Sequence, residues 1–431
     1  MSAHRVVVVG AGFGGLACAR ALDKAPVDVL VLDRHNYHLF TPLLYQVATS
    51  LLNPSDIAYP LRAIFRRSGN VRFRQAMVSS VDLSARVVRT AAGEEFAFDS
   101  LVLATGSTNN YFANASLAHH TLGMKTLAEA LRLRNHVLSC LELATRVRTT
   151  DEQREWLTFV VVGGGPTGVE YAGALAELLR LVLGRDYPEL DPALARIVLL
   201  EGLERLLGAF HPKLGAYAAD ELRKRGIDVR TSTLVDGAGD EHVVLRGGEQ
   251  IRTRTIVWSA GVRPEYPLHD EALPRSRSER LAVDERLRLP GADGVYVIGD
   301  AASVNHDGEE LPMLSPPAMQ GGWYVARAIL DTAAGRPGER SPFRYVDKGT
   351  MATIGRRAAV ADVRGLKLKG TLGWLAWLFV HIYYLIGFRN RAVVLASWAW
   401  DYVRRDRPIR VIVRSDADPI AAQVDVEDVD P

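Results

Sequence analysis

Near its N-terminus the chain reads VVVVGAGFGGL, from Val6 to Leu16. Four β-branched residues before a glycine cluster predict a strand that is buried on both faces of a parallel sheet. The glycines follow the spacing G-x-G-x-x-G, with Gly10, Gly12 and Gly15, and a helix-like run follows them. In that setting the first glycine suits a tight turn, the second admits a pyrophosphate, and the third lets the helix pack on the strand. A purely structural glycine turn is the alternative interpretation.

The next apolar segment favours nucleotide binding over a structural turn. Residues 27–32 are predominantly apolar and Asp33 follows them directly. An acidic side chain at the end of the second strand accepts hydrogen bonds from an adenosine ribose in dinucleotide-binding folds. The first forty residues therefore predict a dinucleotide-binding domain that reads the ribose of an adenosine group.

The same pattern recurs in the middle of the chain. An apolar run at 159–162 leads into GGGPTGVE, from Gly163 to Glu170, and a helix-like segment follows at 171–183. A further strand, 196–200, ends in Glu201. Two fingerprints imply two dinucleotides, of which one is normally a tightly held flavin and the other an exchangeable nicotinamide. We therefore predict an α/β flavoprotein with two Rossmann-like dinucleotide-binding domains.

Length and composition are those of an ordinary folded protein. The 431 residues are 48% hydrophobic and 24% charged, with a formal net charge of +2. This chain length predicts two or three domains, and no nucleic-acid partner is expected. The two cysteines, Cys18 and Cys140, fall in helix-like stretches and are expected to be small buried side chains. With no Cys-x-x-Cys or metal-ligand cluster, no metal site is expected, and neither is a secretory signal.

Charge is unevenly distributed near the C-terminus. Residues 348–414 contain thirteen Lys or Arg and three Asp, whereas the final seventeen residues contain six acidic residues and no basic one. The basic segment favours an anionic surface as a partner, and the acidic tail is expected to be disordered.

Several segments between and after the fingerprints are candidates for cofactor contacts. Residues 34–46 are rich in aromatic and apolar groups and require a cover, whether their own domain, a flat cofactor or an apolar substrate. Residues 71–88 suggest antiparallel strands. The strands 100–106 and 255–261 are counterparts that each end in small residues and carry the chain between domains. Asp300 follows a strand at 295–298, where ligands of parallel sheets collect, although it also suits a helix N-cap.

The segment after Asp300 contains a helix and a lysine of interest. Pro316 to Gly322 opens a helix predicted at 323–330, whose N-terminal dipole would favour electron density on a reduced flavin. Lys348 lies in a predicted apolar strand at 343–355, either as a surface lysine or as a functional cation.

An apolar segment near the C-terminus predicts membrane attachment. Residues 371–387 read TLGWLAWLFVHIYYLIG, and basic residues flank them on both sides. As a helix this segment spans about 26 Å, less than the roughly 30 Å hydrocarbon core of a bilayer. A second apolar stretch, 392–400, follows a break predicted at 389–391. We expect two interfacial helices, with Trp374, Trp377, Tyr383 and Tyr384 at headgroup level. A buried core helix or a dimer contact is the alternative.

At this point the sequence resembles the type II NADH:quinone oxidoreductases, which are single-chain respiratory dehydrogenases that do not pump protons. The resemblance runs over nearly the whole chain. Four motifs carry it: NYHLFTPLLYQVA at 36–48, VVGGGPTGVE at 161–170, DKGTMATIGR at 347–356 and LIGFRNR at 385–391. The last two distinguish this family from other flavoproteins with two dinucleotide sites.

The resemblance implies non-covalent FAD, NADH and a set of site residues. The residues implied to bind the two cofactors are Gly10, Gly12, Gly15, Asp33, Arg34, Thr41, Thr105, Gly106, Asp300 and Ala318 for FAD, and Gly163, Gly165, Gly168, Glu201 and Gly261 for NADH. Glu170, Lys348 and Gln320 are implied to be catalytic, and Gln46, Gln320 and Lys348 to lie near the quinone. The family has Ala-Gln-x-Ala-x-Gln before its third-domain helix, whereas residues 315–320 here read SPPAMQ and keep only the second glutamine.

The resemblance also implies an organisation and a function. The expected domains are an FAD-binding domain at 1–111 and 262–345, an NADH-binding domain at 112–261, a C-terminal strand and membrane-anchoring helices at 346–414, and the acidic tail at 415–431. The expected activity passes two electrons from NADH through FAD to a membrane quinone, on the cytoplasmic side of the cell membrane, with a homodimer as one possible assembly. Glu170, at a helix N-terminus beside Lys348, is expected to stay ionised.

Four other functions compete with this one. A reductase of a protein acceptor such as ferredoxin, or a non-catalytic NADH-sensing flavoprotein, would not need the apolar C-terminus. Dithiol flavoenzymes and sulfide:quinone oxidoreductases need reactive cysteines beside the flavin. Because Cys18 lies in the fingerprint helix, the sequence disfavours both cysteine-dependent chemistries.

Overall fold

The computed structural model describes residues 3–268, 273–336, 338, 340–404 and 409–413. The acidic tail predicted at 415–431 lies outside these residues. The chain divides into two compact units. The first unit comprises Met1–Leu39, Ala58–Thr108 and Val262–Lys348, and the second comprises Phe40–Ile57, Asn109–Gly261 and Gly349–Pro431.

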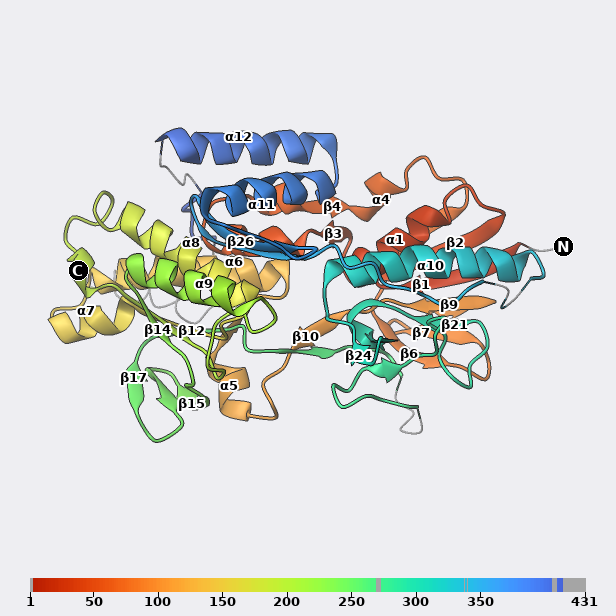
Figure 1. Ribbon diagram of the computed structural model, residues 1–431, viewed down its shortest axis with the longest axis horizontal. Helices are drawn as coiled ribbons and strands as arrows, with labels where there is room; N and C mark the ends of the chain where they lie inside the picture. The colour runs from red at the N-terminus through yellow and green to blue at the C-terminus, as the bar shows by residue number, and fades with distance from the viewer. Residues whose placement is uncertain (1–2, 269–272, 337, 339, 405–408, 414–431) are drawn as a thin grey trace, which may run out of the picture. The chain divides into compact units, whose positions relative to one another are not determined.

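A five-stranded parallel sheet forms the centre of the first unit (Figure 1). Its strands, in spatial order, are β21 (Val295–Val297), β9 (Ser100–Leu103), β1 (His4–Val9), β2 (Val27–Asp33) and β5 (Val71–Gln75). All four neighbouring pairs are parallel. The strand predicted from the first fingerprint, β1, is the central one, and its valines at positions 6–9 are buried, as a strand covered on both faces requires.

Two long helices of the first unit pack against each other. They are α1 (Phe13–Ala21), which follows the first fingerprint, and α10 (Ser315–Ala333). A Cβ built on Gly322 of α10 would lie 2.3 Å from the carbonyl oxygen of Gly14, so only glycine permits this approach. The helix predicted at 323–330 begins earlier than expected, because Pro316 and Pro317 occupy its first turn, where a missing N–H removes no hydrogen bond.

The region predicted as antiparallel strands at 71–88 is only partly so. The strands β6 (Val78–Asp82), β7 (Val87–Thr90) and β8 (Glu95–Ala97) do form an antiparallel sheet. By contrast, β5 joins the parallel sheet beside β2. Short-range alternation cannot distinguish these arrangements, because an edge strand of a parallel sheet also exposes one face.

The second unit repeats the sheet of the first. Its parallel strands, in spatial order, are β11 (Leu122–Gly123), β18 (Thr255–Trp258), β12 (Thr158–Val162), β13 (Arg196–Leu200) and β14 (Ile227–Arg230). The second fingerprint strand, β12, is again central. It lies between the strand that precedes Glu201 and β18, just as β1 lies between β2 and β9. The predicted counterparts at 100–106 and 255–261 therefore occupy equivalent places.

Helices and an antiparallel sheet complete this part of the second unit. The helices are α5 (Ala115–His120), α6 (Leu127–Ala144), α7 (Thr150–Trp156), α8 (Pro166–Val182) and α9 (Pro212–Lys224). The antiparallel strands are β15 (Val235–Gly239), β16 (His242–Leu245) and β17 (Gln250–Arg252).

The C-terminal part of the second unit is an antiparallel meander followed by two helices. The strands are β25 (Thr350–Gly355), β26 (Ala358–Val363) and β27 (Leu366–Lys369), and the helices are α11 (Gly370–Tyr384) and α12 (Phe388–Arg404). The two helices lie side by side (Figure 1). Two predicted helices are thus confirmed, but the break falls at 385–387, where Gly387 has a φ of +89°, rather than at 389–391. The predicted strand at 343–355 is also shorter, because it begins at Thr350 after a turn at Gly349, and Lys348 precedes it.

Shorter elements fill the remaining described segments. They are β3 (Tyr37–Leu39), η1 (Thr41–Leu43), α2 (Leu44–Ala48), α3 (Pro54–Ile57), β4 (Ala58–Pro60), α4 (Leu61–Ile64), β10 (Ser107–Asn109), η2 (Pro192–Leu194), β19 (Val262–Pro264), β20 (Leu281–Ala282), η3 (Gly299–Ala301), β22 (Ala302–Ser303), β23 (Asn305–His306) and β24 (Glu309–Glu310). Across the described residues, the helices are too short or too polar to cross a bilayer.

Candidate functional site

The first glycine loop has the backbone that its spacing predicts. Gly10 has a φ of +95°, and a Cβ at this position would lie 2.3 Å from the carbonyl oxygen of Ala104. A Cβ on Gly15 would lie 1.8 Å from the carbonyl oxygen of Gly10, so α1 packs directly on the turn. Around Gly12, by contrast, there is open space within 4 Å. Two glycines are therefore needed for the fold, and Gly12 leaves room for a group to approach the backbone.

The start of α1 is available to an anion. Gly12 is the N-cap of the helix, and none of the described side chains caps it. The N–H groups of a first helical turn have no partners within the helix, and they carry the positive end of its dipole. A phosphate group is the ligand that such a glycine-lined helix start favours.

Asp33 is fixed under the same loop. Its Oδ2 accepts a hydrogen bond of 2.6 Å from the backbone N–H of Ala11, and its Oδ1 accepts one of 2.7 Å from the N–H of His35. Burial raises the pKa of Asp33, although these two hydrogen bonds oppose that shift. The carboxylate is thereby held at the end of β2, where a ribose hydroxyl would reach it.

His38 supports the loop, and the sequence did not single it out. Its Nδ1 lies 2.9 Å from the carbonyl oxygen of Ala11, and Phe13 packs edge-on against its ring at 5.2 Å. Burial lowers the pKa of His38 to about 4, so the neutral ring donates from Nδ1 to this carbonyl. The only signal in the sequence was its position in the aromatic segment 34–46.

Other predicted FAD residues lie in polar clusters of the first unit. The guanidinium of Arg34 donates two hydrogen bonds of 2.8 Å to the carboxylate of Glu265, whose backbone carbonyl accepts from the Thr105 hydroxyl. Asp300, in η3, accepts a hydrogen bond from the Ser107 hydroxyl. Glu265 was not identified from the sequence. Gly106 has a φ of +76°, so the small residue predicted there is required by the backbone.

Gln320 holds the segment that leads to Lys348. Its Nε2 donates to the carbonyl oxygen of Val346 and its Oε1 accepts from the N–H of Val346, both at 3.0 Å. The Lys348 ammonium lies 5.9 Å from the centre of the Trp323 ring, in cation–π geometry. Ala318 is buried in the first turns of the same helix, α10. Gln320 therefore fixes the chain that carries Lys348 by a pair of backbone hydrogen bonds.

The second glycine loop reproduces the first. Gly163 has a φ of +108°, and a Cβ on Gly168 would lie 1.9 Å from the carbonyl oxygen of Gly163. Gly165, the N-cap of α8, has open space within 4 Å, as Gly12 has in the first loop. Glu201 accepts 2.6 Å and 2.7 Å hydrogen bonds from the backbone N–H groups of Gly164 and Leu203, which repeats the bonding of Asp33. The same construction is thus present twice.

Two further residues bear on the second loop. Gly261 packs against Phe112, and a Cβ on this glycine would lie 3.1 Å from that ring. Arg205 donates a 2.9 Å hydrogen bond to the carbonyl oxygen of Gly208, in the segment that follows Glu201.

Glu170 is a buried carboxyl group on α8. Its Oε1 accepts a 3.1 Å hydrogen bond from the backbone N–H of Thr353 in β25. Burial raises its pKa to about 8, although that bond and the nearby Trp377 indole both favour the charged form. The indole N–H itself completes no hydrogen bond of standard geometry with a described residue. The expectation that Glu170 stays ionised is therefore wrong, because loss of hydration outweighs its polar contacts.

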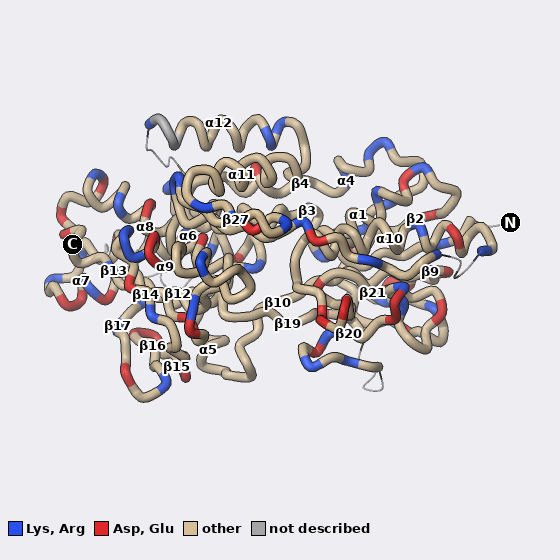
Figure 2. Tube along the Cα trace, in the orientation of Figure 1, with Lys and Arg blue, Asp and Glu red and all other residues tan. Residues whose placement is uncertain are grey.

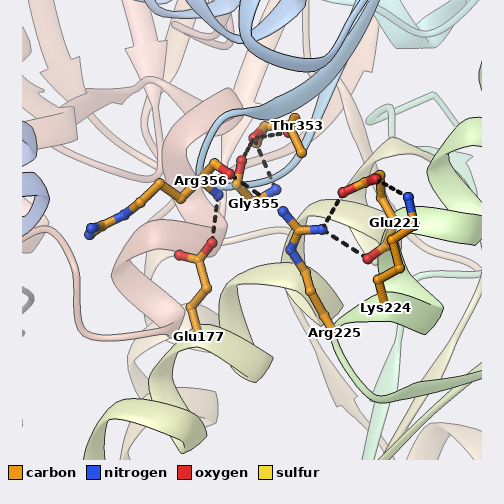
Figure 3. Close-up of polar contacts among 8 residues, drawn as sticks. Glu177, Glu221, Lys224, Arg225, Thr353, Gly355 and Arg356 are labelled. Atoms are coloured by element: carbon orange, nitrogen blue, oxygen red, sulfur yellow. Dashed lines mark hydrogen bonds and ion pairs between the residues drawn. The ribbon is translucent and has the colours of Figure 1, made fainter.

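A polar network positions Thr353 (Figure 3). Glu177 of α8 accepts a 2.6 Å hydrogen bond from the N–H of Arg356, and Arg225 donates both to Glu221 and to the carbonyl oxygen of Arg356. The Thr353 hydroxyl contacts the Gly355 and Ala358 carbonyl oxygens. These contacts tie the turn after β25 to α8 and to the end of α9.

Gln46 and the C-terminal aromatic residues form a second buried cluster in the second unit. Gln46 donates a 2.9 Å hydrogen bond to the Tyr45 hydroxyl and accepts one of 2.8 Å from the Trp398 indole. Trp377 stacks on His381, with ring centres 4.1 Å apart, and burial lowers the pKa of His381 to about 4.

One of these positions departs from the sequence-based interpretation. Trp377 is buried rather than at headgroup level, because its face of α11 packs on β26. The apolar residues around Gln46 are covered by α6 and α8, whereas Thr41 is exposed.

Comparisons with known proteins agree with this arrangement. The family model for pyridine nucleotide-disulphide oxidoreductases matches residues 4–322, and that for the NDH2 C-terminal domain matches residues 348–405. A type II NADH:quinone oxidoreductase, Ndh of Mycobacterium tuberculosis, is 38% identical over 416 residues, which cover 94% of this chain and 89% of that protein. A probable NADH dehydrogenase of Dictyostelium discoideum is 29% identical over 92% of this chain and 88% of its own length.

Solved structures share the fold. NDH2 from Plasmodium falciparum, solved in complex with NADH, aligns with a TM-score of 0.87 over 96% of this chain and 100% of its own, at 19% identity. The sulfide:quinone oxidoreductase of Aquifex aeolicus aligns with a TM-score of 0.72 over 96% of both chains, at 16% identity. From its repeated fingerprint loops, its C-terminal meander and helices, and its identity to relatives over nearly their full length, this chain belongs to the type II NADH:quinone oxidoreductases.

Proposed function

We propose that this chain oxidises NADH and reduces a membrane quinone, with FAD held by the first unit and NADH by the second. The observation that carries this proposal is the duplicated loop. Each copy has a glycine-lined helix start, an open N-cap glycine and a carboxylate bonded to the loop backbone. One such loop serves one dinucleotide, so the chain has the construction for two.

The residues of the first loop fit FAD. The α1 N-terminus would bind the pyrophosphate, Asp33 the adenosine ribose, and Thr105, Gly106, Asp300 and Ala318 the remainder of the cofactor. When bound, FAD would supply the redox chemistry, as the carrier of two electrons from NADH to a quinone. Arg34 and Thr41 complete the proposed FAD set.

The second loop fits NADH rather than NADPH. Glu201 would accept a hydrogen bond from the 2′-hydroxyl of the adenosine ribose, and its charge would repel a 2′-phosphate. Gly163, Gly165, Gly168 and Gly261 would admit the pyrophosphate and the nicotinamide. Arg205, the nearest candidate to soften this preference, is turned to the Gly208 carbonyl.

Proton supply is the proposed role of Glu170. Quinol formation consumes two protons, and a carboxyl group with a pKa near 8 still holds one at neutral pH. We assign Glu170 as the proton donor, Lys348 as a cation near the quinone, and Gln320 as the residue that fixes the Lys348 segment. Gln46 lines the quinone side in this proposal.

Membrane attachment is proposed through α11 and α12. Their outward faces expose Leu372, Phe379, Tyr383 and Phe388, with Phe379 73% and Phe388 89% exposed. An apolar face on a short helix with basic ends suits the membrane interface. We place the protein on the cytoplasmic side of the cell membrane, and a homodimer is compatible with this placement. The proposed domains are those expected from the sequence: FAD-binding at 1–111 and 262–345, NADH-binding at 112–261, and membrane-anchoring at 346–414.

The two thiols do not favour a dithiol flavoenzyme or a sulfide:quinone oxidoreductase. Cys18 and Cys140 are both buried, and burial raises the pKa of the Cys18 thiol to about 12. A thiol that stays protonated is a poor nucleophile. Dithiol or sulfide chemistry is therefore disfavoured.

Steady-state and rapid kinetics test the proposal. Purified protein should release FAD on denaturation and should turn over NADH with a soluble quinone analogue far faster than with ferredoxin. Release of FMN, or turnover confined to ferredoxin, would overturn it. Stopped-flow mixing then separates flavin bleaching by NADH from reoxidation by quinone, and Glu170→Gln should slow the second step more than the first.

A further inference from the structure

A solvent-open pocket of about 410 Å³ lies at the C-terminal end of α12 within the second unit. Its lining residues are Leu181, Arg185, Asp186, Trp400, Arg404 and Arg410. Three arginines face one aspartate in this set, so the lining has an excess of positive charge. The pocket is large enough for a small polar ligand, and it plays no part in the dinucleotide sites described above.

Neighbouring side chains hold two of the three arginines of the pocket. Arg410 forms a 3.0 Å ion pair with Asp186, which neutralises the single acidic residue of the lining. The Arg404 guanidinium lies 5.5 Å from the centre of the Trp400 ring, in cation–π geometry. Guanidinium groups bind phosphate through paired N–H donors, which makes a phosphate-bearing anion the natural ligand.

The surroundings of the pocket select among phosphate-bearing ligands. Trp400 is 54% exposed, so its ring is open to an apolar group beside the arginines. Arg389 and Arg391 lie at the other end of α12, so its charges gather at its two ends (Figure 2). A group that binds here would place its phosphate on the arginines and its apolar part against Trp400 and Leu181.

We propose that this pocket binds the phosphodiester of an anionic phospholipid headgroup, and so fixes the C-terminal end of α12 at the membrane surface. This inference rests on the proposed membrane attachment. A tryptophan beside arginines is typical of the headgroup level, where the ring meets the acyl boundary and the guanidinium meets phosphate. A free phosphate would use the arginines but would gain nothing from the exposed indole.

Vesicle co-sedimentation of the full-length holoenzyme tests the proposal. The vesicles contain phosphatidylcholine, alone or mixed with phosphatidylglycerol. Arg404→Ala should weaken binding to the mixed vesicles by more than about tenfold, since it removes charge-assisted hydrogen bonds to phosphate. Arg389→Ala is the matched control, because it removes one exposed charge from the same helix, and it should cost about fivefold or less.

Other outcomes overturn the proposal in distinguishable ways. Equal losses for the two variants would show diffuse attraction rather than a headgroup site. Equal binding of the wild type to both vesicle types would leave membrane attachment standing and remove the site. No binding to either type would remove the membrane attachment as well.

Two measurements without vesicles exclude the remaining occupants. Calorimetric titration with inorganic phosphate should show no binding that depends on Arg404, and such binding would assign the pocket to free phosphate. Light scattering should give the same mass for Arg404→Ala and the wild type, and a loss of mass would assign the surface to a second copy of the chain. Both variants should keep their NADH–ferricyanide activity, which confirms that they are folded.

Discussion

At the scale of single residues, the protonation state of Glu170 decides what this group contributes. Its carboxyl oxygen faces a backbone N–H of β25, and its surroundings are otherwise apolar enough to raise its pKa from 4.5 to about 8. Well below pH 4.5 the group is neutral in both the folded and the unfolded chain. As the pH rises, the unfolded chain ionises first, and so the folded state loses stability until Glu170 itself ionises near pH 8.

Glu170→Gln should therefore stabilise the fold at high pH and not at low pH. The amide keeps an oxygen that accepts from Thr353 but never ionises. The expected gain in the free energy of unfolding is on the order of 3 kcal/mol at neutral pH, from a pKa shift of several units. Thermal unfolding followed from about pH 4 to about pH 9 measures it as a growing difference in Tm. A difference that does not change with pH would contradict the raised pKa.

The preference for NADH over NADPH is tested at Glu201, with Asp33 of the first loop as the matched control. Each carboxylate accepts two backbone hydrogen bonds in its own loop. Glu201→Gln should narrow the kcat/KM preference for NADH over NADPH by about tenfold, because the repulsion of a 2′-phosphate is lost. Asp33→Asn should instead weaken FAD retention, with the nicotinamide preference unchanged. Equal use of both nicotinamides by the wild type would contradict the role of Glu201.

At the scale of elements, α8 joins the second glycine loop to the C-terminal meander. Glu170, Gly173 and Glu177 recur at helical spacing and share one face. Each contacts β25 or its turn: Glu170 at Thr353, Gly173 at Ile354 and Glu177 at Arg356. A helix that begins at a nucleotide loop thus also fixes the backbone of the strand that follows Lys348.

Gly173→Ala should disturb this contact. A Cβ there would lie 2.0 Å from the Ile354 carbonyl oxygen, so α8 and β25 must separate. We expect a loss of about 1–3 kcal/mol in the free energy of unfolding, the usual effect of overpacking. The Thr353 N–H would also move away from Glu170. Because Glu170 would lose this hydrogen bond, the pH dependence of quinone turnover should shift.

Gly184→Ala is the control for this substitution, because open space surrounds Gly184 within 4 Å. It should leave both stability and turnover close to those of the wild type. If both variants lost the same stability in thermal unfolding, close packing at Gly173 would not be the cause of the loss in Gly173→Ala.

The limits of sequence interpretation also lie at this scale. The glycine loops, their strands and the acidic residues that follow are local patterns, and each was predicted within a residue or two. The pairing of Gln320 with Val346, of Arg34 with Glu265, and the support of the loop by His38 depend on contacts between segments far apart in sequence. No local pattern encodes them.

At the scale of the whole molecule, one construction used twice accounts for most of what the sequence could predict. In each sheet the fingerprint strand lies at the centre, and the strand that ends in the acidic residue lies beside it. The C-terminal helices were harder, because residues 371–387 are apolar on every side. Which face is buried depends on where β26 packs, and this places Gly373, Trp377 and His381 inward.

Removal of everything after Gly370 is therefore a poor test of membrane attachment. Trp377 packs against the site of Glu170, and α11 covers β26, so a shortened chain would expose a buried carboxyl group and core residues. A loss of vesicle binding in that chain would not separate anchoring from folding. Substitution of the outward face leaves the buried face intact.

Phe379→Glu and Phe388→Glu provide that test. Both side chains are among the most exposed apolar groups described in the chain, at 73% and 89%. Each should weaken binding to phosphatidylcholine vesicles by about tenfold or more. Each substitution removes an aromatic ring that the membrane interface would bury, and it adds a charge there. Met77→Glu, at a residue 59% exposed in the first unit, is the control and should not alter binding. All three variants should retain flavin and ferricyanide reduction, and only the first two should lose turnover with a membrane quinone. If vesicle binding survived both substitutions together, α11 and α12 would not be the anchor, and their apolar faces would need a protein partner instead.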